Sequence, residues 1–259
     1  MAGIKRTADG DDMDIVGMPQ KKFYRSRAHC NPLSHNDSFV YPLRPNAMDW
    51  STHYPNIENP KVEFLDVGCG FGGLTIALAT LFPENLTLAM EIRPKVTEYV
   101  RLRIEALRKD SLETTKAYQN VSVLRTNAMR YLPHYFEKGQ IKKMFFCFPD
   151  PQFKQRNHRR RIVNTHLLTE YAYLIAEGGI LYTITDVEDL HNWHVAKCDA
   201  HPCFERITDA AELEADPCVK AMTEETEEGK KVARSGGKKY IAVYRRLKNA
   251  TIAANTSLF

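Results

Sequence analysis

The sequence predicts an α/β fold in which a mainly parallel sheet is covered by helices. An apolar run over 62–67 ends in a cluster of glycines, and helical apolar spacing follows over 74–82, which indicates a strand, a glycine turn and a helix. Short apolar runs alternate with helical segments along the rest of the chain, as in proteins whose parallel strands are joined by helices. At 259 residues, the chain is long enough for one such domain with a buried core.

The later elements are predicted from the same patterns. A helix is expected over 94–107, where Pro94 suits the first turn, and a second helix is expected over 164–176. Gly178 and Gly179 are expected to form a turn after that second helix. Short apolar runs predict further strands at 86–90, 121–124, 144–148, 180–185 and 240–244.

Composition divides the chain into four parts. The first part is polar, contains four aspartates and lacks apolar periodicity, which predicts a disordered tail. The expected parts are this tail (1–20), a basic and proline-rich extension (21–60), the α/β domain (61–248) and a C-terminal tail (249–259).

Several classes of protein are not expected from the composition. No apolar run approaches about 18 residues, so a membrane span is not expected. The polar N-terminus lacks the apolar core of a signal peptide, which favours a cytosolic or nuclear location. The six cysteines show no repeated spacing, so reduced thiols are expected.

The glycine cluster predicts a binding site for a nucleotide-like cofactor. Its glycines over 68–73 fit the G-x-G-x-x-G spacing of dinucleotide-binding proteins and, together with Asp66, the spacing of S-adenosylmethionine-dependent methyltransferases. Glycine lets a backbone approach a ligand closely, and a helix start offers unpaired N–H groups. Glu91 ends the next strand, about 20 residues further on, where an acid accepts hydrogen bonds from ribose hydroxyls. A ribose-bearing ligand is therefore expected, and its identity stays open at this point.

A second group of candidate site residues follows other strands of the predicted sheet. Asn127 and Ala128 come just after one strand, and Asp150 stands between two prolines after another. The carboxyl ends of parallel strands face the ligand-binding crevice, so these residues are expected to lie there. Asp150 either accepts hydrogen bonds from the amide edge of a nucleobase or serves as an ordinary turn or capping acid.

Three basic segments indicate a polyanionic partner. The segments are 21–29 with four Lys/Arg, 153–161 with five and 230–248 with eight, and none contains an acidic residue. Basic side chains neutralise phosphates, and the aromatic rings of the first segment could stack on bases. A charge run is often only a solvated surface, and an acidic protein or a nucleotide stays possible, but nucleic acid is favoured.

A metal site is not expected. His191, His194, Cys198, His201 and Cys203 lie close together in the sequence, but their spacing matches no usual zinc pattern. The apolar and aromatic residues among them indicate a packed helix instead.

Six motifs, in order, resemble those of the catalytic subunit of eukaryotic tRNA (guanine-N7)-methyltransferases. The similarity extends from about residue 20 to residue 246. The motifs are QKKFYRSRAHCNP (20–32), DVGCGFGG (66–73), EIR (91–93), FPDP (148–151), YTITDV (182–187) and TEEGKK (226–231).

The resemblance implies a class I S-adenosylmethionine-dependent methyltransferase fold, Rossmann-like, with a mainly parallel seven-stranded sheet and helices on both faces. It implies S-adenosyl-L-methionine as methyl donor and a guanine in the tRNA variable loop as acceptor. It also implies a WD-repeat β-propeller subunit as partner in a heterodimer, and a location in the nucleus.

The resemblance also carries site residues to positions of this chain. Asp150 matches the catalytic position. Cofactor contacts are implied at Gly68, Glu91, Ile92, Arg93, Asn127, Ala128, Cys147, Thr226, Glu227 and Glu228. Beside the resemblance, the first two basic segments predict nucleic-acid contacts at Lys21, Lys22, Arg25, Arg27, Lys154, Arg156, Arg159, Arg160 and Arg161.

Guanine N7 has a lone pair in the ring plane and no proton to lose, so its methylation needs no strong base. Catalysis then depends on alignment and on stabilising the positive charge that develops on the base. We expect Asp150 to bind the N1/N2 edge of the guanine and to stabilise this cation. An NAD-dependent oxidoreductase and a non-catalytic RNA-binding subunit are the alternatives that the residues leave open.

Overall fold

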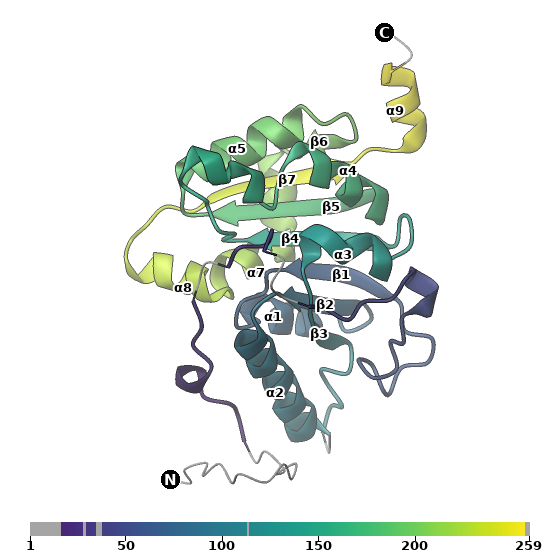
Figure 1. Cartoon of the computed structure of the whole chain (residues 1–259), viewed down its shortest axis with the longest axis vertical. Helices are drawn as coiled ribbons and strands as arrows, with labels where there is room; N and C mark the ends of the chain where they lie inside the picture. The colour runs from purple at the N-terminus through teal and green to yellow at the C-terminus, as the bar shows by residue number, and fades with distance from the viewer. Residues whose placement is uncertain (1–16, 28–29, 35–37, 113, 257–259) are drawn as a thin grey trace.

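A seven-stranded sheet forms the centre of the computed structural model (Figure 1). The structure describes residues 17–27, 30–34, 38–112 and 114–256. The strands lie in the order β3-β2-β1-β4-β5-β7-β6, with β1 to β5 parallel and the last two antiparallel to their neighbours. The strands are β1 (Val62–Val67), β2 (Leu86–Glu91), β3 (Val121–Arg125), β4 (Ile141–Cys147), β5 (Ile175–Thr185), β6 (Phe204–Arg206) and β7 (Tyr240–Arg246).

This order makes the fold that of a class I methyltransferase, as predicted. The strand order reverses between β1 and β4, and such sheets bind ligands at the carboxyl ends of the strands beside this reversal. The glycine loop follows β1, and the Asp150 loop follows β4. The topology alone therefore brings the two main candidate segments to one crevice.

Helices cover both faces of the sheet. On one face lie α1 (Gly73–Leu81), α2 (Pro94–Ser111) and α7 (Pro217–Glu224), and on the other lie α3 (Ala128–Tyr135), α4 (Thr165–Leu174) and α5 (Glu188–Asp199). The others are α6 (Ala210–Ala215), α8 (Glu227–Arg234) and α9 (Asn249–Thr256), and Figure 1 shows α9 projecting from the body. Short 3-10 turns are η1 (Lys21–Phe23), η2 (Pro45–Ala47) and η3 (Gln155–Arg160).

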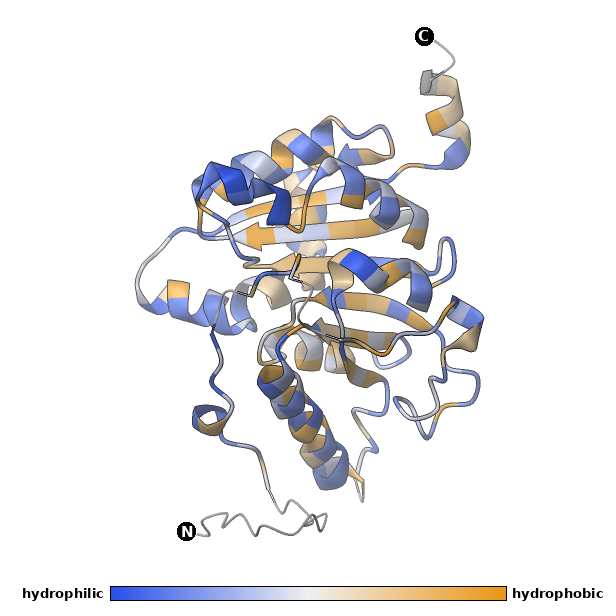
Figure 2. Cartoon of the chain, in the orientation of Figure 1, coloured by the Kyte–Doolittle hydropathy of each residue, from blue (hydrophilic) through white to orange (hydrophobic). Residues whose placement is uncertain are grey.

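The core is divided by the sheet because successive strand residues point to opposite faces. Phe145 stacks on Tyr182 with ring centroids 4.5 Å apart on the α1 and α7 side, whereas the adjacent Phe146 packs on Tyr171 of α4. Burial on both faces makes these strands nearly continuous in apolar residues, and Figure 2 shows the apolar colour concentrated on the strands. This pattern is the reason that the sequence predicted the central strands.

One predicted turn is wrong, and several elements were not predicted. The expected turn at Gly178 is wrong: β5 continues through both glycines, with Gly178 at φ +77° and a shift in its pairing to β4. Gly179 fits there because an added Cβ would lie 2.9 Å from the Lys142 carbonyl oxygen. Neither α3 nor the three-residue β6 was predicted. Residues 205–228 are rich in acidic side chains and had no predicted element, and they form the end of β6, α6, α7 and the start of α8.

The N-terminal extension packs against the α/β domain. Tyr24 meets Tyr99 of α2 edge to face, and Tyr41 stacks on Tyr131 of α3 at 4.2 Å. Tyr54 is fully buried and donates a hydrogen bond to the Thr87 carbonyl at 2.9 Å. The tail predicted for 1–20 lies outside the described residues up to residue 16, and the C-terminal tail predicted from residue 249 contains α9. Within the described part of the chain, no helix is both long and apolar enough to cross a membrane.

His194 of α5 is buried in the core without hydrogen bonds. Its side chain is 1% exposed, and both ring nitrogens lack a partner among the described residues. Burial, assisted by the charges of His191 and Arg161, lowers the pKa of His194 from 6.5 to about 3. The unfolded chain therefore binds a proton at this residue below about pH 6.5 while the folded chain does not. This difference weakens the fold as the pH falls toward 3.

We predict that His194→Leu reduces the loss of stability in acid. Relative to wild type, the variant should gain about 2 kcal/mol more in free energy of unfolding at pH 4.5 than at pH 8. Urea unfolding at both pH values measures the difference, with His166→Leu on the exposed surface as the control. An equal effect of His194→Leu at the two pH values would contradict the prediction.

Candidate active site

The glycine loop after β1 has a backbone shape that favours glycine. Gly68, Gly70 and Gly72 have φ values of +78°, +55° and +77°, in the left-handed region that other residues adopt at a cost. The amides of Gly68 and Cys69 donate to the Met90 carbonyl at 2.8 and 3.1 Å. The loop is thus fixed to the end of β2, next to Glu91.

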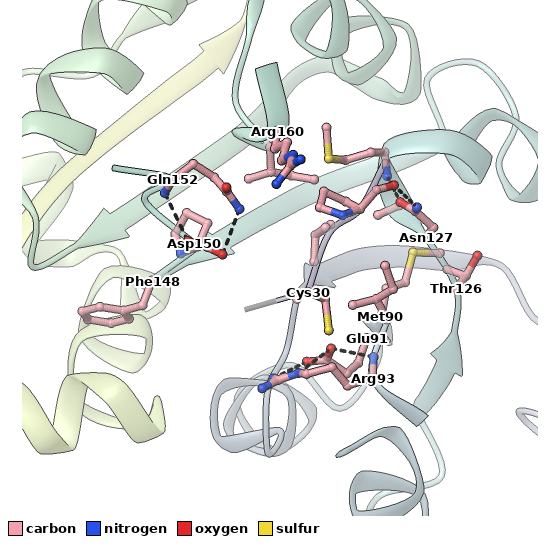
Figure 3. A pocket seen from close by; sticks show the side chains of 18 residues that line it. Cys30, Met90, Glu91, Arg93, Thr126, Asn127, Phe148, Asp150, Gln152 and Arg160 are labelled. Carbon is pink, nitrogen blue, oxygen red and sulfur yellow. Dashed lines mark hydrogen bonds and ion pairs between the residues drawn. The ribbon is translucent and has the colours of Figure 1, made fainter. Parts of the chain in front are cut away.

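Glu91 is a buried carboxylate with four hydrogen bonds. Its Oε1 accepts from the backbone N and Nε of Arg93, both at 3.0 Å, and its Oε2 accepts from Gly70 N at 3.2 Å and Arg93 Nη2 at 2.7 Å. Burial lowers the pKa of Arg93, but its hydrogen bonds and charge pairing with Glu91 outweigh this and leave that pKa raised. The two residues form a strong charged pair at the crevice (Figure 3).

Asp66, on β1, is a second buried carboxylate beneath the loop. It is 1% exposed and accepts a hydrogen bond from the Thr75 hydroxyl at 2.6 Å. Burial raises the pKa of Asp66 to about 6, the Thr75 hydrogen bond lowers it, and the nearby charge of Glu91 raises it further. Burial also raises the pKa of the Cys69 and Cys147 thiols well above the ordinary value, so neither is suited to act as a thiolate.

Two adjoining cavities lie at the carboxyl edge of the sheet, with volumes of about 190 and 360 Å³. Both are lined by Gly68, Arg93 and Asp150. The first also contains Glu91, Ile92, Asn127, Ala128 and Arg160, and the second also contains Asp66, Cys147, Thr226, Glu227 and Glu228. The structure therefore brings every residue of the implied cofactor set to these two cavities.

Asp150 lies in a tight loop directly after β4. Phe148 and Gln152 on either side of it have φ values of +50° and +49°, which are unusual for residues other than glycine. Gln152 donates to the carboxylate twice, from its backbone N at 3.1 Å and from its side-chain Nε2 at 2.8 Å (Figure 3). Phe148 N donates to the Ile184 carbonyl of β5 at 2.8 Å. The loop thus presents an oriented carboxylate to both cavities.

Asn127 and Thr226 each cap a helix at the edge of the site. The Asn127 Oδ1 caps α3 by accepting from Met129 N at 3.1 Å, and its Nδ2 donates to the Pro32 carbonyl of the N-terminal extension at 2.6 Å. The Thr226 hydroxyl caps α8 by accepting from Gly229 N at 3.0 Å and donates to the Met222 carbonyl. Both side chains therefore fix the position of the segments that surround the site.

Apart from Arg161, the basic residues predicted to contact nucleic acid are of three kinds. Lys22, Arg25 and Arg27 are exposed, and so are Lys154, Arg156 and Arg159. Lys21 is also exposed, but its Nζ forms an ion pair with Glu227 at 2.5 Å. Arg160 is half-buried and lines the first cavity, where its Nε has no hydrogen-bond partner within the described structure.

Arg161 departs from the sequence prediction of a nucleic-acid contact. Its side chain is 1% exposed and forms an ion pair with Asp189 at 2.7 Å. A buried and paired guanidinium does not face a phosphate backbone, so we correct its role to a structural one. Its position at the end of a basic run gave no sign of burial, because its acidic partner Asp189 lies 28 residues further along the chain.

One residue of the site, Gln152, was not singled out from the sequence. Gln152 holds the Asp150 carboxylate, and no local signal distinguishes it from an ordinary loop glutamine. Gly73 begins α1 where an added Cβ would lie 2.1 Å from the Glu225 carbonyl oxygen. Only glycine at position 73 lets the start of α1 lie this close to the backbone of the segment that leads into α8. This glycine was already part of the G-x-G-x-x-G spacing found in the sequence. Among the described residues, no group of three or more His, Cys, Asp or Glu is placed to hold a metal ion.

The chain is similar to a known family over most of its length. A family model described as "Putative methyltransferase" matches residues 60–242. A tRNA (guanine-N(7)-)-methyltransferase of Lodderomyces elongisporus is 56% identical over 91% of this chain and 78% of the relative. One of Arabidopsis thaliana is 55% identical over 90% of this chain and 93% of the relative. A solved structure of the aminoglycoside resistance methyltransferase NpmB1 is 15% identical, with a TM-score of 0.48, over 81% of this chain and 100% of that chain.

We predict that Asp66→Asn stabilises the ligand-free protein at alkaline pH. Since the folded-state pKa is raised from 3.8 to about 6, the ionised carboxylate opposes folding above pH 6, and this cost disappears below pH 4. The amide removes the charge and still accepts the Thr75 hydrogen bond. Thermal and urea unfolding should show a gain of up to about 3 kcal/mol at pH 8. No gain is expected at pH 4. A loss of stability at pH 8 would refute this explanation of the buried carboxylate.

Proposed function

Because the chain belongs to the tRNA (guanine-N7)-methyltransferase family, we propose that S-adenosylmethionine is its methyl donor and that the donor binds in the two adjoining cavities. The chain is an enzyme that methylates N7 of guanine in tRNA. Family membership favours this activity over the NAD-dependent oxidoreductase and the non-catalytic RNA-binding subunit. The observation that carries the proposal for the donor site is that Glu91, the glycine loop and Asp150 line adjoining cavities.

The residues at the glycine loop fit this donor. A Cβ added at Gly68 or Gly70 would meet no atom within 4 Å, so there is open space above the loop backbone for a ligand. The buried carboxylate of Asp66 lines the second cavity and favours positive charge there, whereas the carboxylate of Glu91 is already paired with Arg93. When bound, S-adenosylmethionine supplies an electrophilic methyl group on a positively charged sulfur.

Glu91 must exchange a partner when it binds a ribose. Each of its oxygens already accepts two hydrogen bonds, which fills the four positions of a carboxylate. Two of the donors are backbone amides, and the other two belong to the Arg93 side chain. We propose that the Arg93 side chain gives way to the ribose hydroxyls, because it is the donor group that is free to rotate.

Asp150 is proposed to act on the guanine and not on a proton of the reaction. The Gln152 hydrogen bonds fix its carboxylate before substrate arrives, so alignment requires little reorganisation. Its negative charge favours the N1–H and N2–H edge of guanine and stabilises the cation that forms when N7 is alkylated. We propose that the exposed basic residues near Asp150, including Lys154 and Arg156, contact the phosphates of the tRNA around its variable loop.

We predict different losses for the two carboxylates. Asp150→Asn should abolish guanine N7 methylation of total tRNA, at least about a 100-fold loss, while calorimetric binding of S-adenosylmethionine stays near wild type. Glu91→Ala should weaken donor binding by about 10-fold or more, because it removes the ribose acceptor. Transfer of labelled methyl followed by nucleoside analysis measures the activity.

Wild-type enzyme and Glu98→Ala on the exposed side of α2 serve as controls. A full methylation rate in Asp150→Asn would exclude its proposed catalytic role. Donor affinity unaffected by Glu91→Ala would place the ribose elsewhere.

We also propose that the chain acts in the nucleus as a heterodimer with a WD-repeat β-propeller subunit. The support is the resemblance of its six motifs to the eukaryotic catalytic subunit. Co-expression with a candidate propeller subunit should yield a 1:1 complex with higher methylation activity than the chain alone, and a tagged chain should accumulate in nuclei. Separate elution of the two proteins together with full activity of the single chain would contradict the proposed partner. Exclusion of the tagged chain from nuclei would contradict the proposed location.

A further inference from the structure

Arg161 is held by contacts on three sides in the interior of the protein. Its Nε donates to the Pro151 carbonyl at 2.9 Å, and its Nη2 donates to Asp189 Oδ2 at 2.7 Å. The guanidinium carbon also lies 4.8 Å from the ring centroid of Trp193 on α5. Trp193 in turn donates to the Val163 carbonyl at 2.7 Å, which fixes the ring. Arg161 therefore joins the residue after Asp150 to α5.

The loop around Asp150 needs such support. A non-glycine residue in the left-handed region costs roughly 1 to 2 kcal/mol, and this loop contains two, Phe148 and Gln152. Strained loops persist only where their surroundings fix them. The Phe148 amide is bonded to β5 on one side, and on the other side the bond from Arg161 reaches Pro151, the neighbour of both Asp150 and Gln152.

We propose that Arg161 is a positioning residue for Asp150 and does not contact tRNA. By holding Pro151, it maintains the turn in which Gln152 orients the Asp150 carboxylate toward the cavities. The inference rests on the proposed role of Asp150 in the reaction. It separates Arg161 from the exposed Arg159 of the same basic run.

The geometry argues against a phosphate contact at Arg161. To reach RNA, the side chain would have to leave both hydrogen bonds and the Trp193 ring, and the Pro151 carbonyl would lose the bond from Arg161. The Asp189 side chain is 73% exposed, so solvent screens its end of the ion pair. The Arg161 side chain is only 1% exposed and is therefore not accessible to a phosphate. A guanidinium suits this position because two of its nitrogens, Nε and Nη2, are held in one plane and reach the two partners, whereas a lysine offers only one nitrogen.

The test compares variants in single-turnover methylation with enzyme in excess over tRNA and saturating donor. When folded enzyme saturates the tRNA, the observed rate constant does not depend on enzyme concentration, so a fraction of unfolded enzyme does not change it. Arg161→Lys, which keeps the charge, should lower this rate constant by about tenfold or more. The matched control Arg101→Lys, at a surface ion pair on α2, should leave it unchanged.

The dependence of tRNA affinity on salt provides the second measurement. Arg161→Lys and Arg161→Gln should leave the slope of log affinity against log salt at its wild-type value. Arg159→Gln should make it shallower by about 0.7 to 0.9, as expected for the loss of one phosphate contact. Asp189→Asn changes an exposed side chain and tests the inference without removing the buried guanidinium. It should lower the rate constant by about threefold with no change in slope, because Arg161 is held less firmly.

Two results would overturn the inference. One is a wild-type rate constant in both Arg161→Lys and Asp189→Asn beside an inactive Asp150→Asn, which leaves the role of Asp150 intact and removes that of Arg161. The other is a shallower salt slope for Arg161→Gln. Failure of the proposed function gives a different pattern, since Asp150→Asn would then methylate at the wild-type rate. If Arg161→Lys does not fold, the rate constant of Asp189→Asn decides.

Discussion

The bonds between the glycine loop and the end of β2 are the constraint on which the rest of the site depends. The Gly68 and Cys69 amides donate to the Met90 carbonyl, and Gly70 N donates to the Glu91 carboxylate. These contacts exist because Val67 is paired with Met90 in the parallel register of β1 and β2. A slip of one residue would turn Glu91 to the opposite face of the sheet. The register between β1 and β2 therefore determines whether the glycine loop can bond to the Glu91 carboxylate.

Much of this arrangement follows from the sequence because the central strands are buried on both faces. Burial makes them apolar runs, so their ends are visible in the sequence, and Glu91, Asn127 and Asp150 each follow such an end. Parallel strands place these ends at one edge of the sheet. The elements that were missed lack such a signal. β6 has only three residues, and α7 contributes Cys218, Ala221 and Met222 to the core from within an acidic segment.

Side-chain roles inside the basic segments could not be predicted in the same way. Lys21 forms an ion pair with Glu227 near the opposite end of the chain, and Arg161 forms one with Asp189 on α5. Sequence gives the number of charges in a run but not which of them meets an acid or an aromatic ring after folding. The division between exposed Arg159 and buried Arg161 is a property of the tertiary structure. The same holds for Gln152, whose backbone and side-chain donors both reach the Asp150 carboxylate in the folded loop.

The site also contains groups that burial makes unfavourable for stability. Asp66 is held beneath the loop with a raised pKa, near the charge of Glu91, and the Asp150 loop contains two left-handed residues. Such features persist where function requires them and other contacts offset their cost. A positively charged ligand in the cavity would stabilise the ionised form of Asp66 and lower its pKa, because opposite charges favour ionisation. The interaction that destabilises the ligand-free fold is thus one that favours a cationic ligand, and the surrounding hydrogen bonds of Thr75, Gln152 and Arg161 keep the site in shape until that ligand binds.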